Sequence, residues 1–477
     1  MIVRLASRFP YVSRAFLIPL IVACAMFMEN MDATVLATSL PVLARDFGVS
    51  PIALKLALIS YVVGLGVFIP ICGWVADRYG TRTVFRAALG VFIVGSLLCA
   101  ASHSLVTFVA ARFVQGIGGA MMVPVGRIII FRSIPKRDFL KAISYLTVPG
   151  LFGPVIGPPL GGFITTYFHW RWIFVINLPI GLLGMVLASR YIANLREEIP
   201  EALDFRGFVL SALGGSLVML GLSLIGGELV SPLTALAMLV IGVLALYGYW
   251  RHAKRDQPGA APPLLDLELL RIPTFQASVL GGSLFRIGLG AMPFLLPLAL
   301  QEGLGMSAFE SGSITCASAF GGLFMKSIAS TVLGRFGYRT VLIFNAILAG
   351  MAIAACGLFT SATPHLLMLA VVLLGGFFPS LQFTSLNSIA YADIPSKHVS
   401  RATSLASVIQ QLSLGLGVAI AGLTLQLSHH LQGHTVIENS DFWPAFLTVG
   451  LFSVASIPLT RRLAPDAGDE LARRSKV

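Results

Sequence analysis

The sequence predicts an all-α integral membrane protein in which fourteen helices cross the bilayer. Hydrophobic residues occupy 56% of the 477 positions and charged residues only 11%, whereas a soluble domain carries about 25% charge. Fourteen apolar runs can be counted, and about 20 apolar residues suffice to cross the hydrocarbon core. A short charged turn between two of these runs recurs in the second half of the chain, which predicts a duplicated architecture.

The apolar runs follow one another closely. Glycine, with 48 residues, and proline, with 26, are frequent, as membrane helices tolerate. The first run continues past Glu29 and Asp32, so it predicts an uncleaved helix rather than a signal peptide. The runs lie at roughly 15–38, 52–72, 83–102, 105–130, 140–165, 171–192, 206–227, 232–250, 274–300, 309–332, 340–360, 364–390, 402–428 and 442–460.

The charged turn at 73–83 is too short to be a domain, so the runs on either side must be antiparallel neighbours. Its segment Asp77–Thr83 recurs as Gly334–Thr340. The two copies are separated by more residues than six spans and their connections need, and the excess is long enough for one extra helix pair. The predicted organisation is a six-helix half at 1–192, two intercalated helices with cytoplasmic linkers at 193–273, a second six-helix half at 274–461, and a cytoplasmic tail at 462–477.

The basic residues predict the orientation in the membrane. The formal net charge is +12, and nearly all Lys and Arg outside the runs lie in the two tails and the even-numbered connections. The opposite side holds only Arg45, Lys55 and Arg171. This bias places both termini in the cytoplasm, and it explains the positive charge without a nucleic-acid partner.

Neither a metal centre nor an enzymatic site is expected. The five cysteines all lie in apolar runs and form no CxxC pair. His429, His430 and His434 fall in a predicted outer loop, where no cysteine or close carboxylate supports a metal site. No phosphate-binding loop or nucleophile–base pattern occurs either, so we expect no cofactor and no catalysis on this chain.

Five segments resemble motifs of one transporter family. The turn reads Gly73-x-x-x-Asp77-Arg78-x-Gly80-x-Arg82, which resembles the signature loop between helices two and three of the major facilitator superfamily. The segment Arg112–Ala120 resembles the fourth-helix motif of proton-coupled members, and Gly150–Gly162 is similar to the fifth-helix motif of antiporters. Asp32–Pro41 and Trp170–Gly181 resemble the fourteen-helix drug:H⁺ antiporter branch.

The resemblance implies a gating loop and an antiporter motif. The gating loop comprises Gly73, Asp77, Arg78, Gly80 and Arg82, with Arg335, Gly337 and Arg339 in its second copy. The second copy has Gly334 in place of Asp77, so we expect a weaker charge–dipole interaction there. The antiporter motif comprises Gly153, Pro154, Gly157, Gly161 and Gly162. Positions 153, 157 and 161 repeat every four residues and therefore share a helix face.

Asp32, Glu29 and Arg112 are the candidates for proton coupling. Asp32 and Glu29 are three residues apart, so they lie on one face of the first helix. Carboxylates inside a membrane usually mark a pathway, a proton relay or an ion pair; the alternative is that both lie near a helix end and reach the interface. Arg112 lies within a span and needs a partner. The resemblance places it near the proton site, and the alternative is a purely structural pair.

A substrate cavity is expected between the two halves. Two cations without a local carboxylate, Arg286 and Lys326, fall in helices nine and ten. Polar residues within spans provide further candidate lining: Gln115, Gln382, Asn387 and Gln410. For each of them a helix–helix hydrogen bond is an equally good interpretation.

The resemblance implies a proton-coupled exporter of amphipathic or lipophilic small molecules that works by alternating access. We expect it to act as a monomer in the bacterial inner membrane, with protons, the substrate and the lipid bilayer as its partners. One alternative is export of a specific organic anion or metabolite, favoured if Arg286 and Lys326 face the cavity. Another is a membrane receptor or scaffold that no longer transports, although a scaffold has no reason to keep costly intramembrane charges.

Overall fold

The computed structural model describes residues 14–134, 139–197, 202–225, 230–254, 263–395, 398–434, 436–468 and 470. Half of the predicted tail and the middle of the 251–273 connection therefore lie outside the described residues. Within them every regular element is a helix. In chain order these are α2 (Arg14–Phe47), η1 (Pro51–Leu54), α3 (Lys55–Phe68), η2 (Ile69–Ile71), α4 (Cys72–Tyr79), α5 (Thr81–Ala100), α6 (Leu105–Ser133), α7 (Phe139–Tyr167), α8 (Trp172–Val175), α9 (Asn177–Tyr191), α10 (Phe205–Leu224), α11 (Pro232–Ala253), η4 (Leu267–Arg271), α12 (Pro273–Gln276), η5 (Ala277–Gly281), α13 (Gly282–Leu298), η6 (Ala299–Gly303), α14 (Ala308–Phe336), α15 (Tyr338–Cys356), α16 (His365–Ile389), α17 (Val399–Gln432), η8 (Asn439–Asp441), α18 (Phe442–Ala455) and α19 (Ile457–Thr460).

The predicted membrane-spanning fold is confirmed. In the described residues, 13 helical stretches are long and apolar enough to cross a membrane. Some consist of consecutive short helices, as in Pro51–Tyr79 and Pro273–Gly303. The 29-residue α7 adds a fourteenth long helix where the apolar run 140–165 predicts one. It keeps four prolines inside its length, which a helix buried among other membrane helices tolerates.

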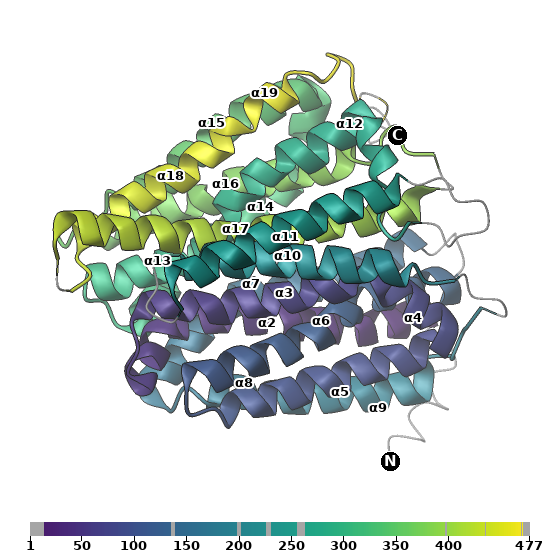
Figure 1. Ribbon diagram of the computed structural model, residues 1–477, viewed down its shortest axis with the longest axis horizontal. Helices are drawn as coiled ribbons and strands as arrows, with labels where there is room; N and C mark the ends of the chain where they lie inside the picture. The colour runs from purple at the N-terminus through teal and green to yellow at the C-terminus, as the bar shows by residue number, and fades with distance from the viewer. Residues whose placement is uncertain are drawn as a thin grey trace.

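The helices form two bundles that lie side by side (Figure 1). In the first bundle α2 packs on α7, α6 and α9, while α6 also packs on α3 and α5. In the second, α16 packs on α14 and α15, and α13 packs on α17 and α18. Buried aromatic side chains fill both interiors, such as Phe85 and Phe92 in the first and Phe285 and Phe446 in the second. The bundles meet where α7 contacts α14, α3 contacts α17 and α2 contacts α13.

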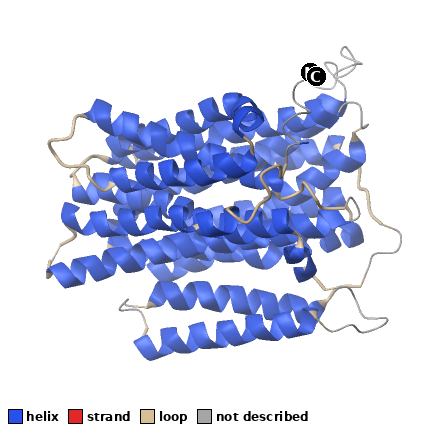
Figure 2. Ribbon diagram, turned by 90° about the horizontal axis from the view of Figure 1, so that it is seen from above, coloured by secondary structure: helices blue, strands red, loops and turns tan. Residues whose placement is uncertain are grey.

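The helices α10 and α11 form a pair on one side of the two bundles. They pack on each other, and α10 also touches α3 and α17. Figure 1 draws the pair across the front, and Figure 2, seen from above, shows two helices set against one edge of the molecule. Large apolar side chains of α11, among them Leu233 and Leu244, are exposed, as suits a helix in contact with lipid. The division into residues 1–192, 193–273, 274–461 and 462–477 stays a prediction.

The glycines of α7 allow it to lie very close to α2. A Cβ atom placed on Gly153 would lie 2.9 Å from the backbone nitrogen of Met31. One placed on Gly161 would lie 2.6 Å from the carbonyl oxygen of Val35. Side chains of α2 use this proximity, since Asn30 Nδ2 donates to the Gly150 carbonyl at 3.1 Å. Van der Waals contact between small residues therefore holds the two helices together.

A second small-residue face of α7 meets the other bundle. A Cβ atom on Gly162 would lie 2.8 Å from the Phe309 Cα of α14. On the α14 side, a Cβ atom on Gly312 would lie 2.8 Å from the Pro158 carbonyl carbon. Gly162 thus points away from the α2-facing glycines, and α7 is held between the two bundles.

We expect Gly161→Ala to lower the thermal stability of the purified protein. The added methyl must displace α2 backbone, and overpacking of this kind costs about 1–3 kcal/mol. Gly375→Ala in α16 is the matched control, because no atom lies within 4 Å of the Cβ position there. Melting temperatures in detergent check the pair. Equal melting temperatures for the two variants would contradict the close-packing account.

Candidate functional site

Asp32 lies in the middle of α2, a helix of 34 residues. Its residue is only 3% exposed, so it does not reach the interface from a helix end. That alternative interpretation is wrong for Asp32. A carboxylate at this depth requires partners that replace water.

The Asp32 carboxylate accepts hydrogen bonds from three side chains. Arg112 Nη1 on α6 donates to Oδ2 at 2.6 Å, and both side chains of this ion pair are 1% exposed. Oδ1 accepts from Gln115 Nε2 at 2.8 Å and from Asn177 Nδ2 at 2.7 Å. Three donors aimed at one group suit its ionised form, and charge-assisted hydrogen bonds of this kind are the strong ones.

Two further side chains complete what we call the Asp32 network, formed by Asp32, Arg112, Gln115, Asn177, Ser96 and Tyr61. Ser96 Oγ on α5 accepts from Gln115 Nε2 at 2.9 Å and from Asn177 Nδ2 at 3.2 Å. The Arg112 guanidinium lies 4.5 Å from the centre of the Tyr61 ring, a cation–π contact that is strengthened by burial. Helices α2, α3, α5, α6 and α9 of the first bundle all contribute to the network.

Glu29 lies one helical turn before Asp32 and is bonded differently. Its Oε2 is buried and has no hydrogen-bond partner among the described residues. A buried carboxyl oxygen without a donor is costly when charged. The two carboxyls of α2 therefore have distinct environments, one fully bonded and one not.

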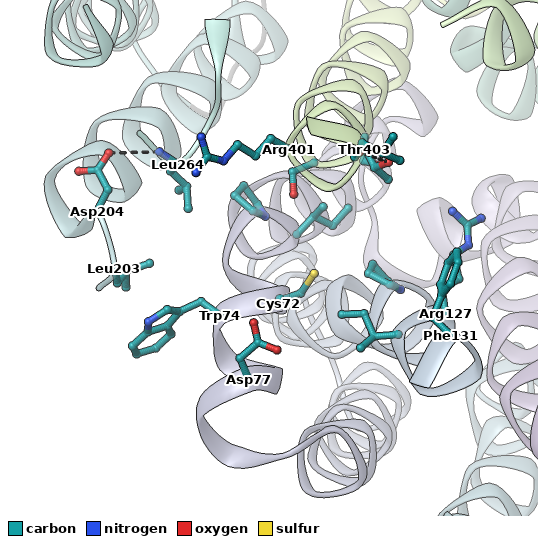
Figure 3. A pocket seen from close by; sticks show the side chains of 18 of the residues that line it. Cys72, Trp74, Asp77, Arg127, Phe131, Leu203, Asp204, Leu264, Arg401 and Thr403 are labelled. Atoms are coloured by element: carbon teal, nitrogen blue, oxygen red, sulfur yellow. Dashed lines mark hydrogen bonds between the residues drawn. The ribbon is translucent and has the colours of Figure 1, made fainter. Parts of the chain in front are cut away.

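A cavity of about 760 Å³ lies between the bundles at the end that carries the 73–83 turn. Figure 3 shows Asp77 and Arg127 on the first-bundle side and Arg401 and Thr403 of α17 across from them. Segments next to α10 and α11 also reach it through Leu203, Asp204, Pro263 and Leu264. The cavity thus has charged walls from both bundles.

The gating-loop residues around Asp77 form a compact polar cluster. Arg132 Nη2 on α6 donates to Asp77 at 2.7 Å and to Glu197 at 2.8 Å. The Glu197 backbone nitrogen donates to the Asp77 carbonyl at 3.0 Å. Arg78 lies over the Trp74 ring at 5.5 Å. In this state Asp77 is therefore paired within its own bundle.

The two turns require glycine at the same point. Gly80, with φ of 91°, ends α4, and Gly337, with φ of 74°, ends α14. A Cβ atom on Gly80 would also clash with the Asn194 side chain. Gly73 differs, since nothing lies within 4 Å of its Cβ position, and close packing does not require glycine there. Of the basic residues, Arg335 is exposed, whereas Arg82 and Arg339 are half-buried.

The opposite end of the molecule is closed by contacts between the bundles. Arg45 at the end of α2 pairs with Glu302 at 2.9 Å. Gln301 Nε2 donates to the Thr38 carbonyl at 2.9 Å. The described cavity therefore opens toward the 73–83 turn, while polar and close-packed contacts seal the other end.

The residues predicted to line a substrate cavity are dispersed. The described wall of the 760 Å³ cavity includes none of the six. Gln115 belongs to the Asp32 network, Gln382 is fully buried and bonded to Asn345 at 3.1 Å, Lys326 is exposed on α14, and Gln410 is half-buried on α17. Only Arg286 and Asn387 come together, with Nη2 donating to Oδ1 at 3.1 Å. Their assignment to a substrate cavity stays a prediction.

Several polar residues of this region carried no assigned role in the sequence analysis. Asn177 donates to the carboxylate of Asp32, and Ser96 accepts from Asn177; each could have been found as a polar residue inside an apolar run. Lys55, assigned only to the side opposite the termini, is 3% exposed. Its Nζ has no hydrogen-bond partner among the described residues, and it lies against Gly422 of α17. A charged lysine without a partner is costly to bury. Lys55 therefore adds a buried ionisable group at the contact between the two bundles.

Comparison with known proteins settles the family. Residues 22–292 and 278–476 match the family model described as Major Facilitator Superfamily. This chain belongs to the major facilitator superfamily. Several bacterial relatives carry the name "Putative multidrug resistance protein MdtD". The protein of Pectobacterium atrosepticum is 37% identical over 462 residues, 95% of this chain and 97% of the relative. That of Yersinia enterocolitica is 35% identical over 450 residues, with 94% and 95% covered.

Solved structures of superfamily transporters share the fold. The POT family transporter PepTSo superposes with a TM-score of 0.70 at 16% identity, covering 96% of this chain and 98% of that one. A D-xylose–proton symporter gives a TM-score of 0.67 at 16% identity, with 96% and 99% covered. At such low identity the likeness extends to the arrangement of helices alone.

We expect Asp32 and Arg112 to be strongly coupled in stability. Asp32→Asn leaves a buried guanidinium without its counter-charge, and Arg112→Gln leaves a buried carboxylate, each costing about 3–5 kcal/mol. The double variant should lose clearly less than the sum of the single losses. Thermal unfolding of the four proteins in detergent checks this. Arg45→Gln, at an exposed pair, is the control and should cost about 0–1 kcal/mol. Additive losses at 32 and 112 would contradict the pairing.

Proposed function

We propose that this protein is a proton-coupled secondary active exporter of amphipathic or lipophilic small molecules in the bacterial inner membrane. The observation that carries the proposal is the buried Asp32–Arg112 pair at 2.6 Å, an expensive arrangement that a merely structural membrane helix does not need. The multidrug resistance names of relatives at 35–37% identity support the substrate class. Transport without catalysis and action as a monomer belong to the same proposal.

Proton binding at Asp32 would be coupled to conformation through its donors. The ionised carboxylate accepts from Arg112, Gln115 and Asn177. A proton removes the counter-charge of Arg112 and turns one acceptor oxygen into a donor. The side chains of α6 or α9 that donate to that oxygen then need new partners, so the protonated and ionised forms would favour different packings of the first bundle. A cationic substrate would compete with the proton for the charged state.

The direction of transport rests on the orientation in the membrane. The distribution of Lys and Arg supports a cytoplasmic location for both termini and for the 73–83 turn. The 760 Å³ cavity would then open to the cytoplasm, where it would accept substrate. The Arg45–Glu302 pair would close the outer side.

Closure of the cavity would bring Asp77 toward α17. Asp77 and Arg401 lie on opposite walls (Figure 3), and α17 begins at Val399. A carboxylate is stabilised at a helix N-terminus and beside a guanidinium. Asp77 would therefore exchange its pairing with Arg132 for contacts across the cavity. The second turn has glycine at 334, so this gate is expected to be one-sided.

A second candidate is export of an organic anion. Arg286 is 3% exposed, and its hydrogen bonds go to the Ser278 carbonyl and to Asn387, with no carboxylate among these partners. A buried cation of this kind would suit an anionic group of the substrate, provided that the second bundle opens around it.

We expect Asp32→Asn to abolish uphill, pH-driven transport while substrate binding persists, because asparagine keeps the size of the side chain but does not titrate. Proteoliposomes supplied with a panel of lipophilic cations and organic anions test this through proton movement and substrate flux. Glu29→Gln should have the smaller effect.

Undiminished substrate-induced proton release from Asp32→Asn, with loss in Glu29→Gln, would move the coupling site to Glu29. A proton response to one organic anion alone would support the second candidate. No proton movement with any substrate of the panel that is transported would contradict proton coupling.

We expect Asp77→Asn to favour the open cavity. In the closed state the variant would lack the carboxylate charge beside the N-terminus of α17. That interaction is worth about 0.3–1 kcal/mol, or about two- to fivefold in population. Arg132 keeps Glu197 as its partner, so folding should persist. The readout is the labelling rate of Ser404→Cys, on the cavity wall, in a cysteine-free background. In inside-out vesicles, labelling should be faster in the Asp77→Asn variant than in the protein that keeps Asp77. An unchanged or slower rate would contradict the gate, and labelling only from outside would contradict the orientation.

A further inference from the structure

Three side chains with metal-ligand atoms meet at the end of α17, remote from the Asp32 network. His429 lies in the last turn of α17, His434 just beyond the helix, and Asp441 at the end of η8, directly before α18. Their ligand atoms all lie within 4.8 Å of one another. From the sequence no metal is expected here, because no carboxylate is evident near the histidines. Folding brings Asp441 between the two histidines, so this premise is wrong.

Asp441 is the centre of this group. Its side chain is 0% exposed, although an aspartate is rarely buried without strong partners. Its Oδ2 lies 3.1 Å from His429 Nδ1, and its Oδ1 lies 3.0 Å from His434 Nδ1. In a tetrahedral zinc site with bonds of about 2.0–2.1 Å, ligand atoms are about 3.3 Å apart. Each histidine nitrogen is therefore close to this separation from one Asp441 oxygen, and the three ligand atoms all lie within 4.8 Å of one another, so small side-chain shifts would let them share one ion.

The surroundings hold the candidate ligands in place. The Glu438 backbone nitrogen donates to Asp441 Oδ2 at 3.0 Å. Asn439 Nδ2 donates to the Phe359 carbonyl at 2.7 Å. This bond links the loop to the residues that follow α15. The Glu438 carboxylate lies 3.6 Å from His434 Nε2. When Nδ1 of a histidine binds a metal, its other nitrogen usually donates to a carboxylate or carbonyl, and Glu438 is placed to accept that bond.

We infer that His429, His434 and Asp441 bind a divalent transition-metal ion of the Zn²⁺ type. Two imidazole nitrogens and one carboxylate oxygen suit zinc, cobalt or nickel, whereas calcium and magnesium prefer oxygen ligands throughout. The fourth position is left for water, while Glu438 orients His434. The ion would join the end of α17 to the start of α18. This site is independent of the proposed transport function.

The test uses the untagged, full-length protein in detergent after treatment with a chelator. Zn²⁺ is titrated in competition with a chromophoric chelator, and Co²⁺ is added separately to record its ligand-field absorption. We expect one ion per chain and a rise in melting temperature on adding Zn²⁺. His429→Gln and His434→Gln should each weaken Zn²⁺ binding by at least about tenfold, and Glu438→Gln by about 10- to 100-fold as an orienting group.

The neighbouring His430→Gln is the matched control, because His430 is exposed and outside the cluster. It should bind Zn²⁺ as the unmodified protein does. Binding by the unmodified protein no tighter than by the double variant His429→Gln/His434→Gln would overturn the proposal, as would an equal loss in His430→Gln. If a single variant unfolds, the Co²⁺ spectrum of the unmodified protein still decides, since it must show tetrahedral or five-coordinate nitrogen–oxygen ligation.

Discussion

The cost of placing a charge inside a membrane determines the construction of the first bundle. Asp32 is tolerable at mid-helix because Arg112 neutralises it and Gln115 and Asn177 satisfy its second oxygen. These partners come from different helices, so the carboxylate fixes how α2, α6 and α9 lie relative to one another. Ser96 and Tyr61 extend the same constraint to α5 and α3. Five helices thus share one electrostatic requirement.

The two bundles repeat an architecture but not a chemistry. The first has a bonded carboxylate–guanidinium pair and an acidic residue in its turn. The second has Arg286 beside Asn387 and a glycine at 334. Both turns keep the glycine that ends the preceding helix, at 80 and 337. Duplication therefore preserves the backbone corner, while the buried carboxylate–guanidinium pair lies in the first bundle.

The sequence was sufficient for features that depend on one helix at a time. Length and hydropathy located the spans, and the four-residue spacing of Gly153, Gly157 and Gly161 gave their common face. Contacts between helices that are distant in the chain could not be predicted from the sequence. A single glutamine within a span, such as Gln115 or Gln382, can line a cavity or bond to another helix, and only the three-dimensional packing distinguishes the two. His429 and Asp441 come together because the chain after α17 folds back onto the end of that helix. A periodic pattern in the sequence does not predict such a loop conformation.

The double contact of α7 limits where this helix can vary. One side lies against α2 through Gly153 and Gly161, and another lies against α14 through Gly162. Phe152, Ile156 and Phe163 are 49%, 42% and 43% exposed, and they mark the remaining side. Added volume meets neighbouring backbone at these glycines but not on the exposed side. Among homologous transporters we therefore expect the side-chain diversity of this helix to be concentrated on its exposed side, with the three contact glycines retained.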